Sequence, residues 1–211
     1  MNEKYTSPEE TLNEIKHLME RSSRFLSLSG FSGIFAGIYA LLGALAAWYY
    51  LNFVFHAEGR GRYESSGTDE QDLLTFLFID AILVLILAVG TGIFLTTRKA
   101  KQDGNTLLDA AAKKLIINLC IPLVTGGLFC LALIYHGDTA YVAPVMLIFY
   151  GLALVHASKY TRDDVRSLGI AEICLGLASA VIVGYGLLFW TLGFGVLHIA
   201  YGAYMYYKYE K

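Results

Sequence analysis

The chain has 211 residues, of which 56% are hydrophobic and 16% are charged, and its mean hydropathy is +0.52. Soluble domains are about 45–50% apolar and about 25% charged, so this composition excludes an ordinary soluble domain and a disordered chain. The formal net charge of −2 excludes a broad basic surface for nucleic acid. The sequence therefore indicates an integral membrane protein in contact with the lipid bilayer.

Residues 1–24 are polar and predict a cytoplasmic amphipathic helix ahead of the membrane domain. Leu12, Ile15 and Leu18 recur at helical spacing among acidic residues. Acidic residues outnumber basic ones, which argues against strong binding to anionic lipids. We interpret this segment as a helix packed on the cytoplasmic ends of the bundle, and docking of a cytoplasmic partner protein is the alternative.

Long stretches of low charge divide residues 25–211, which we predict to form one all-α transmembrane domain. A spanning helix needs about 20 apolar residues, and its backbone groups must be hydrogen-bonded within the segment. The last uncharged stretch, Ile173 to Tyr207, is long enough for two helices joined by a tight turn. A polar outer loop is expected at 56–72. The six predicted spans cover about residues 25–50, 73–97, 115–135, 140–158, 168–187 and 189–207.

The distribution of Lys and Arg predicts the orientation. Of the 16 such residues, all but Arg60 and Arg62 fall in the N-terminal segment, the second and fourth loops and the C-terminal tail. Loops rich in Lys and Arg stay in the cytoplasm. We therefore expect a multi-pass protein of the inner, cytoplasmic membrane with both termini inside the cell.

An internal repeat of three helical hairpins is indicated by similar segments in the odd-numbered spans. Alignment of the third and fifth spans pairs Asn118 with Glu172 and Cys120 with Cys174. A helix-capping pattern, with an acidic residue three positions after Ser or Thr, precedes each odd-numbered span. A non-repeating bundle and two inverted halves of three helices are the alternatives. The predicted hairpins cover about residues 25–97, 115–158 and 168–207, and the predicted caps are Ser7, Thr106 and Thr161.

Two glycine-punctuated segments carry a family resemblance. They are Gly-Ile-Ala-Glu-Ile at 169–173 and Gly-Val-Leu-His-Ile-Ala-Tyr-Gly at 195–202. They resemble the short helices of HdeD-like membrane proteins, a bacterial family associated with acid resistance. The resemblance covers mainly the last 40 or so residues and the number of spans, and it implies six spans arranged as repeated hairpins. It carries over no catalytic residue, and His156, His198 and the capped N-terminal helix depart from the family pattern.

Ionisable side chains inside the predicted spans are costly in lipid and mark candidate functional sites. Glu172 and His198 belong to one predicted hairpin, and we expect them at similar depth. A carboxylate and an imidazole in contact favour each other's charged form while burial opposes both, so such a pair can exchange a proton near neutral pH. The alternative is a neutral glutamate in a water-lined crevice and a histidine bonded to a carbonyl. The full set of candidates for a proton, ion or ligand site is Asp80, Glu172, His198, His156 and Asn118.

Small residues at helical spacing predict close packing of helices, within the bundle or in a homo-oligomer. The residues concerned are Gly33, Gly37, Gly176 and Gly184.

Two functions from different classes fit these features. The first is a channel-like or transport protein for a small solute, an ion or protons. The second is a non-transporting scaffold or sensor of the membrane stress response, acting through a cytoplasmic partner. We expect neither an enzyme nor a bound metal or cofactor, because no His and acidic residues converge at metal-ligand or catalytic spacing.

Overall fold

The computed structural model describes residues 24–25, 28–54, 67–102 and 110–211, and all regular structure in these ranges is helical. The predicted N-terminal helix, most of the outer loop and the predicted caps Ser7 and Thr106 lie outside the described residues.

Helices account for almost all of the described chain. Five helical stretches are long and apolar enough to cross a membrane, and α6 is the helix that falls short of this test. The elements are α2 (Gly30–Tyr49) with the π-helical turn η1 (Tyr50–Val54), α3 (Gly67–Gln102), α4 (Ala110–His136), η2 (Thr139–Tyr141), α5 (Val142–Ala157), η3 (Ser158–Tyr160), α6 (Asp164–Val181), α7 (Gly186–Trp190), the π-helix η4 (Thr191–Leu197) and α8 (His198–Tyr209).

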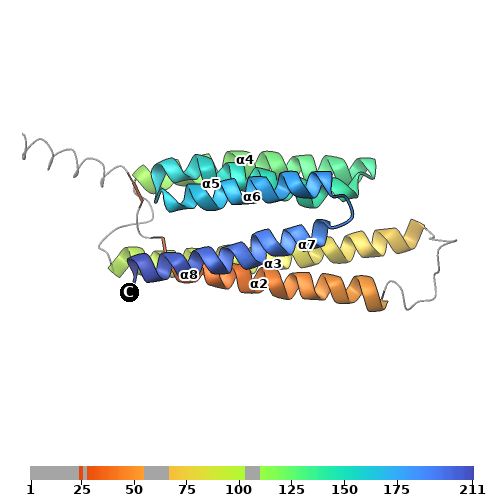
Figure 1. Ribbon diagram of the computed structural model, residues 1–211, viewed down its shortest axis with the longest axis horizontal. Helices are drawn as coiled ribbons and strands as arrows, with labels where there is room; N and C mark the ends of the chain where they lie inside the picture. Colours follow the sequence, from red (N-terminus) through yellow and green to blue (C-terminus); the bar gives the residue numbers. More distant parts are fainter. Residues whose placement is uncertain (1–23, 26–27, 55–66, 103–109) are drawn as a thin grey trace, which may run out of the picture.

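The helices form two layers (Figure 1). One layer contains α4, α5 and α6, and the other contains α2, α3 and the continuous C-terminal helix made of α7, η4 and α8. Within these layers α6 packs chiefly on α5, and α8 packs chiefly on α2. The turn between Val181 and Gly186 carries the chain from one layer to the other. The predicted third hairpin, 168–207, is therefore not a self-packed unit, because each of its helices finds its main partner elsewhere.

Glycines explain these pairings, because they let two helix backbones approach closely. A Cβ atom on Gly151 of α5 would lie 2.5 Å from the carbonyl oxygen of Gly169 on α6. In the other layer, a Cβ atom on Gly202 of α8 would lie 2.7 Å from the carbonyl oxygen of Gly30 on α2. No side chain fits where these helices cross. The glycine pairs therefore allow α5 to pack on α6 and α2 to pack on α8.

The glycines that we predicted to pack fall into two groups. Gly33 and Gly37 lie against the backbone of the C-terminal helix, and Gly176 lies against Ile148 and the Pro144 carbonyl of α5. Gly184 does not pack, since no described atom comes within 4 Å of its Cβ position. Its φ of +96° identifies it as a turn residue, and glycine adopts this left-handed conformation without steric cost.

The two aligned positions of the predicted repeat have different surroundings. The side-chain amide of Asn118 donates a hydrogen bond to the Lys114 carbonyl of its own helix, 2.8 Å away. Glu172, its predicted counterpart, is fully buried between helices. The two polar side chains that the predicted repeat aligns therefore have different environments and make different contacts.

Candidate functional site

A carboxyl group and an imidazole ring meet where the two layers face each other. Glu172 on α6 is 0% exposed and His198, the first residue of α8, is 7% exposed. The Glu172 Oε1 atom lies 3.4 Å from His198 Nδ1. Neither Glu172 oxygen has a hydrogen-bond partner among the described residues. A buried carboxyl group without such partners loses its hydration without full compensation, which makes this position costly for the fold.

Two hydrogen bonds hold the His198 ring. Its Nδ1 lies 3.0 Å from the Gly193 carbonyl oxygen, and its Nε2 lies 2.7 Å from the Tyr150 hydroxyl. A carbonyl oxygen only accepts, so this geometry assigns a proton to Nδ1. In the neutral ring Nε2 then accepts from the Tyr150 hydroxyl. Phe194 stacks on the same ring with an interplanar angle of 21°, so the imidazole is fixed in orientation.

The π-helical segment η4 builds the wall that faces Glu172. A π-helix widens the helical turn, and such segments are frequent at functional sites. Here it lets the side chain of His198 reach the carbonyl of Gly193, five residues earlier. A Cβ atom on Gly193 would collide with Glu172 Oε2 and with Leu147. The absence of a side chain at this position therefore makes room for the carboxyl group.

The surroundings of the pair are mostly apolar. Leu147 is fully buried beside it, and Tyr150 and Tyr201 pack against the cluster of Leu154, Val165 and Leu168. Two further buried oxygens, the hydroxyls of Ser179 and Tyr201, have no hydrogen-bond partner in the described part of the chain. Glu172 and Tyr201 are therefore polar groups of this region without a hydrogen-bond partner among the described residues, and Ser179 lies seven residues after Glu172 on α6.

The other predicted site residues lie apart from this pair. Asp80 on α3 is half-buried beside Gly43 of α2, in the layer opposite Glu172, and it makes no hydrogen bond or ion pair with the described residues. His156 is exposed at the end of α5, and Asn118 bonds to its own helix. The structure therefore brings together two of the five candidates and does not unite all five in one site.

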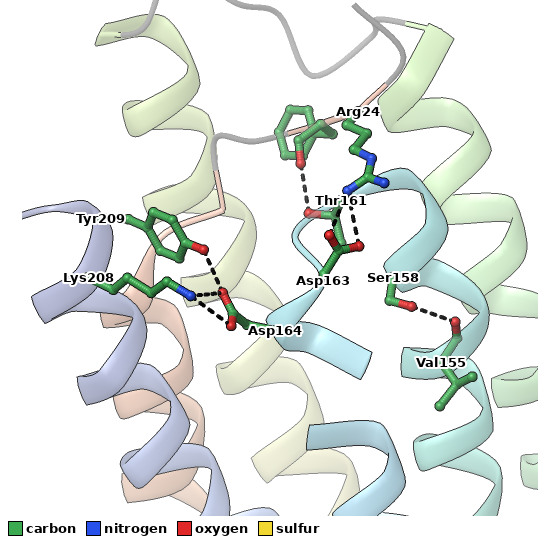
Figure 2. Close-up of polar contacts among 9 residues, drawn as sticks. Arg24, Val155, Ser158, Thr161, Asp163, Asp164, Lys208 and Tyr209 are labelled. Atoms are coloured by element: carbon green, nitrogen blue, oxygen red, sulfur yellow. Dashed lines mark hydrogen bonds and ion pairs between the residues drawn. The ribbon is translucent and has the colours of Figure 1, made fainter. Parts of the chain in front are cut away.

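A second polar cluster surrounds the start of α6 (Figure 2). The Asp164 carboxylate accepts hydrogen bonds from Lys208 Nζ at 3.0 Å and from the Tyr209 hydroxyl at 2.6 Å. Burial alone would raise the pKa of Asp164, but the hydrogen bonds from Tyr209 and Lys208 outweigh it and hold the pKa below its usual value. Asp164 is therefore ionised at neutral pH and fixes the end of α8 to α6.

The predicted cap at Thr161 is wrong. The residue before α6 is Asp163, which makes no side-chain capping bond. The buried Thr161 hydroxyl instead donates to the Phe25 carbonyl at 2.7 Å, and Arg24 forms an ion pair with Asp163 at 3.0 Å (Figure 2). Tertiary contact with the segment before α2 has replaced the local cap.

The C-terminal tail supplies an interaction that the sequence analysis missed. Glu210 Oε1 accepts from Lys99 Nζ at 2.7 Å and from the Gly30 backbone N–H at 2.6 Å. The carboxylate thus caps α2, where the helix dipole favours a negative charge. It also ties the beginning of α2 to the end of α3.

Three residues of the buried site were also missed, namely Tyr150, Gly193 and Tyr201. Tyrosines in an apolar span look like interfacial aromatic residues, and nothing local distinguishes Tyr150 from Tyr141 or Tyr160. The sequence feature that could have located this site is the pair Gly193 and Gly195 shortly before His198. Small residues in a helix allow other groups to approach its backbone closely.

Comparison of the chain with models of known protein families, with curated proteins and with solved structures finds no match. Function is therefore inferred from the geometry of the site.

Proposed function

We propose that the chain spans the membrane six times, with α6 as the additional span and both termini in the cytoplasm. α6 runs alongside α5 (Figure 1), and its lower hydropathy comes from charged residues at its beginning and from Glu172, which faces inward. At the end of the bundle where α3 finishes and α4 begins, Phe25 packs with Ala100 and Ala111. The excess of basic residues in the segments at this end supports a cytoplasmic location for it.

Reporter fusions test this topology. Fusions at positions 62, 138 and 188 should report the outside of the cell, and fusions at 104 and 163 should report the cytoplasm. The physical reason is that Lys and Arg in short loops resist translocation. Opposite results at 104 or 163 would contradict the proposed orientation, and a cytoplasmic signal at 188 alone would remove α6 from the spans.

For function, we propose that the protein is a proton-linked transport or channel-like protein whose proton site is Glu172 with His198. The observation that carries this proposal is a fully buried carboxyl group, without a hydrogen-bond partner, 3.4 Å from an imidazole nitrogen. An isolated charge in the membrane interior is costly, whereas an adjacent imidazolium makes the ion pair competitive with the neutral pair. Acid protonates Glu172 and alkali deprotonates His198, so the charged pair exists only at intermediate pH.

The substitution Glu172→Gln tests the proton site. Proteoliposomes containing the wild-type chain should conduct protons when a pH difference is imposed across the membrane. The flux should depend on pH between about 5 and 8, where a histidine titrates. Glu172→Gln should lower the flux at least about tenfold, which corresponds to about 1.4 kcal/mol in a barrier, because the amide preserves shape and cannot carry the charge.

Asp138→Asn is the matched control for this experiment. Asp138 is an exposed residue in the turn before α5 and makes no side-chain capping bond, so its loss of charge should leave the flux unchanged. A flux that persists in Glu172→Gln with its pH dependence intact would contradict the proposed site. A wild-type chain without proton flux would exclude the transport function.

A membrane sensor or scaffold is the second candidate, and one set of contacts favours it. Arg24, the last residue of the predicted N-terminal helix, forms an ion pair with Asp163, and the carbonyl of Phe25 accepts a hydrogen bond from Thr161, just before α6. A change in the protonation of Glu172 that moves α6 would therefore also move the segment that would bind a cytoplasmic partner, through these two contacts. The resemblance to HdeD-like proteins suggests acid stress as the setting for either function.

A further inference from the structure

Helices α6 and α8 face each other through three successive levels of side chains. The level at the end of the bundle pairs Asp164 with Lys208 and Tyr209. The level deepest in the bundle pairs Glu172 with His198. Eight residues of α6 separate these two polar levels, a rise of about 12 Å. The middle level is occupied by Leu168 and its apolar cluster, on which Tyr201 packs.

The Tyr201 hydroxyl is the unusual group at the middle level. Its oxygen is buried and has no hydrogen-bond partner among the described residues. Tyr201 lies three residues after His198 on α8 and packs with Tyr150 on the same apolar cluster. Tyr204, three residues further along α8, donates a hydrogen bond to Asp164 at 3.5 Å. An orphan hydroxyl in an apolar cluster is costly, and it stands between two groups of hydrogen-bonded side chains.

We propose that the Tyr201 hydroxyl connects the buried pair of Glu172 and His198 to the end of the bundle around Asp164, as the middle step of a path for protons. The inference rests on the proton site proposed above and specifies how that site exchanges with one side of the membrane. The steps are Tyr209 with Asp164, Tyr201, Tyr150 and His198, and bridging water completes the contacts made by Tyr201.

Each transfer along this path balances without leaving a charge on a tyrosine. The Tyr150 O–H bond breaks as the Nε2–H bond of His198 forms, over the existing 2.7 Å hydrogen bond. A bridging water gives a proton to the Tyr150 oxygen and takes the proton of Tyr201, and Tyr201 is restored by a water-borne proton from the Asp164 side. The product is an imidazolium whose Nδ1 lies 3.4 Å from Glu172 Oε1. One proton has then entered the site, and the positive charge of the imidazolium compensates the negative charge of the Glu172 carboxylate.

The groups that face this path define its pH dependence. Tyr150 approaches from α5, His198 and Tyr201 from α8, and Glu172 from α6. At the Asp164 end of the path the charged groups are Asp164, its ion-pair partner Lys208, and Arg162, which lies over the Tyr209 ring. The equilibrium protonation of the site is therefore set by Glu172 and His198, whereas Tyr201 controls only how fast the site exchanges protons.

This separation of rate from equilibrium gives the test. The full chain in nanodiscs is subjected to a rapid pH change, and the infrared band of Glu172 is followed in time, assigned as the band that disappears in Glu172→Gln. Tyr201→Phe should slow the response of this band about tenfold, equivalent to about 1.4 kcal/mol in the barrier. The equilibrium titration of the band should not move, because the phenyl ring preserves the packing. Tyr150→Phe, which interrupts the next step, should also slow the response.

Tyr39→Phe is the matched control. The Tyr39 hydroxyl lies 3.2 Å from Thr91 Oγ1, between α2 and α3, and is not part of the path. A wild-type rate in Tyr201→Phe, or an equal slowing in Tyr39→Phe, would overturn the proposed path and leave the proton site in place. A Glu172 band that never responds to pH would overturn both the path and the proton site.

Discussion

Gly202→Ala should destabilise the folded chain by about 1–3 kcal/mol, the usual cost of forcing extra atoms into a close-packed contact. The added Cβ would lie 2.6 Å from the Ile34 backbone nitrogen and 2.7 Å from the Gly30 carbonyl oxygen. Both atoms belong to the backbone of α2, so relief requires the two helices to separate. The free energy of unfolding in mixed detergent micelles measures the effect.

Gly90→Ala is the control for this prediction. Gly90 is also inside a long helix, α3, but no described atom lies within 4 Å of its Cβ position. Alanine is preferred to glycine in a helix interior by about 0.5–1 kcal/mol, so this variant should be as stable as the wild type or slightly more stable. Equal losses in the two variants would show that α2 and α8 do not pack through Gly202.

Glu172→Met should raise the free energy of unfolding by about 1–3 kcal/mol, the cost of a buried polar group left without a partner. Methionine has a similar length and is flexible enough to fill the space beside Leu147 and Gly193. The same substitution should abolish the proton flux, so stability and activity should move in opposite directions. Such opposition is expected where a residue is retained for function.

Glu210→Met provides the matched comparison at neutral pH. This carboxylate forms a largely buried ion pair with Lys99 and accepts a hydrogen bond from the Gly30 N–H. Its removal leaves both partners unsatisfied, so the variant should lose stability. A loss of stability in Glu172→Met as well would mean that the Glu172 carboxylate has compensating partners, and the argument for an uncompensated site would fail.

Local composition was sufficient to predict the class of protein and the positions of its long helices. The five apolar helical stretches of the structure coincide with predicted spans, because a run of apolar side chains is a property of neighbouring residues in the chain. The remaining predicted span corresponds to α6, which is not among the helices long and apolar enough to cross a membrane. The charged residues of α6 lower its mean hydropathy, and only the folded structure shows whether their side chains face lipid or other helices.

Glu172 and His198 were identifiable as out of place in lipid because each is a polar residue within an apolar segment. Their contact was expected from membership of one hairpin, but the structure produces it differently. α6 and α8 lie in different layers, and the pair spans the face between them. Asp80, equally conspicuous in the sequence, lies beside Gly43 in a single layer and stays out of this contact.

The sequence by itself determined that the chain is helical and apolar and where its costly polar groups fall, since these depend on one segment at a time. Only the tertiary structure decided how the helices pair, because that depends on backbone approach at Gly151 with Gly169 and at Gly30 with Gly202. It also decided that Tyr150 holds His198 across 48 positions of sequence. Hydrogen bonds between distant segments form only after packing has placed both partners, so no local sequence pattern predicts them.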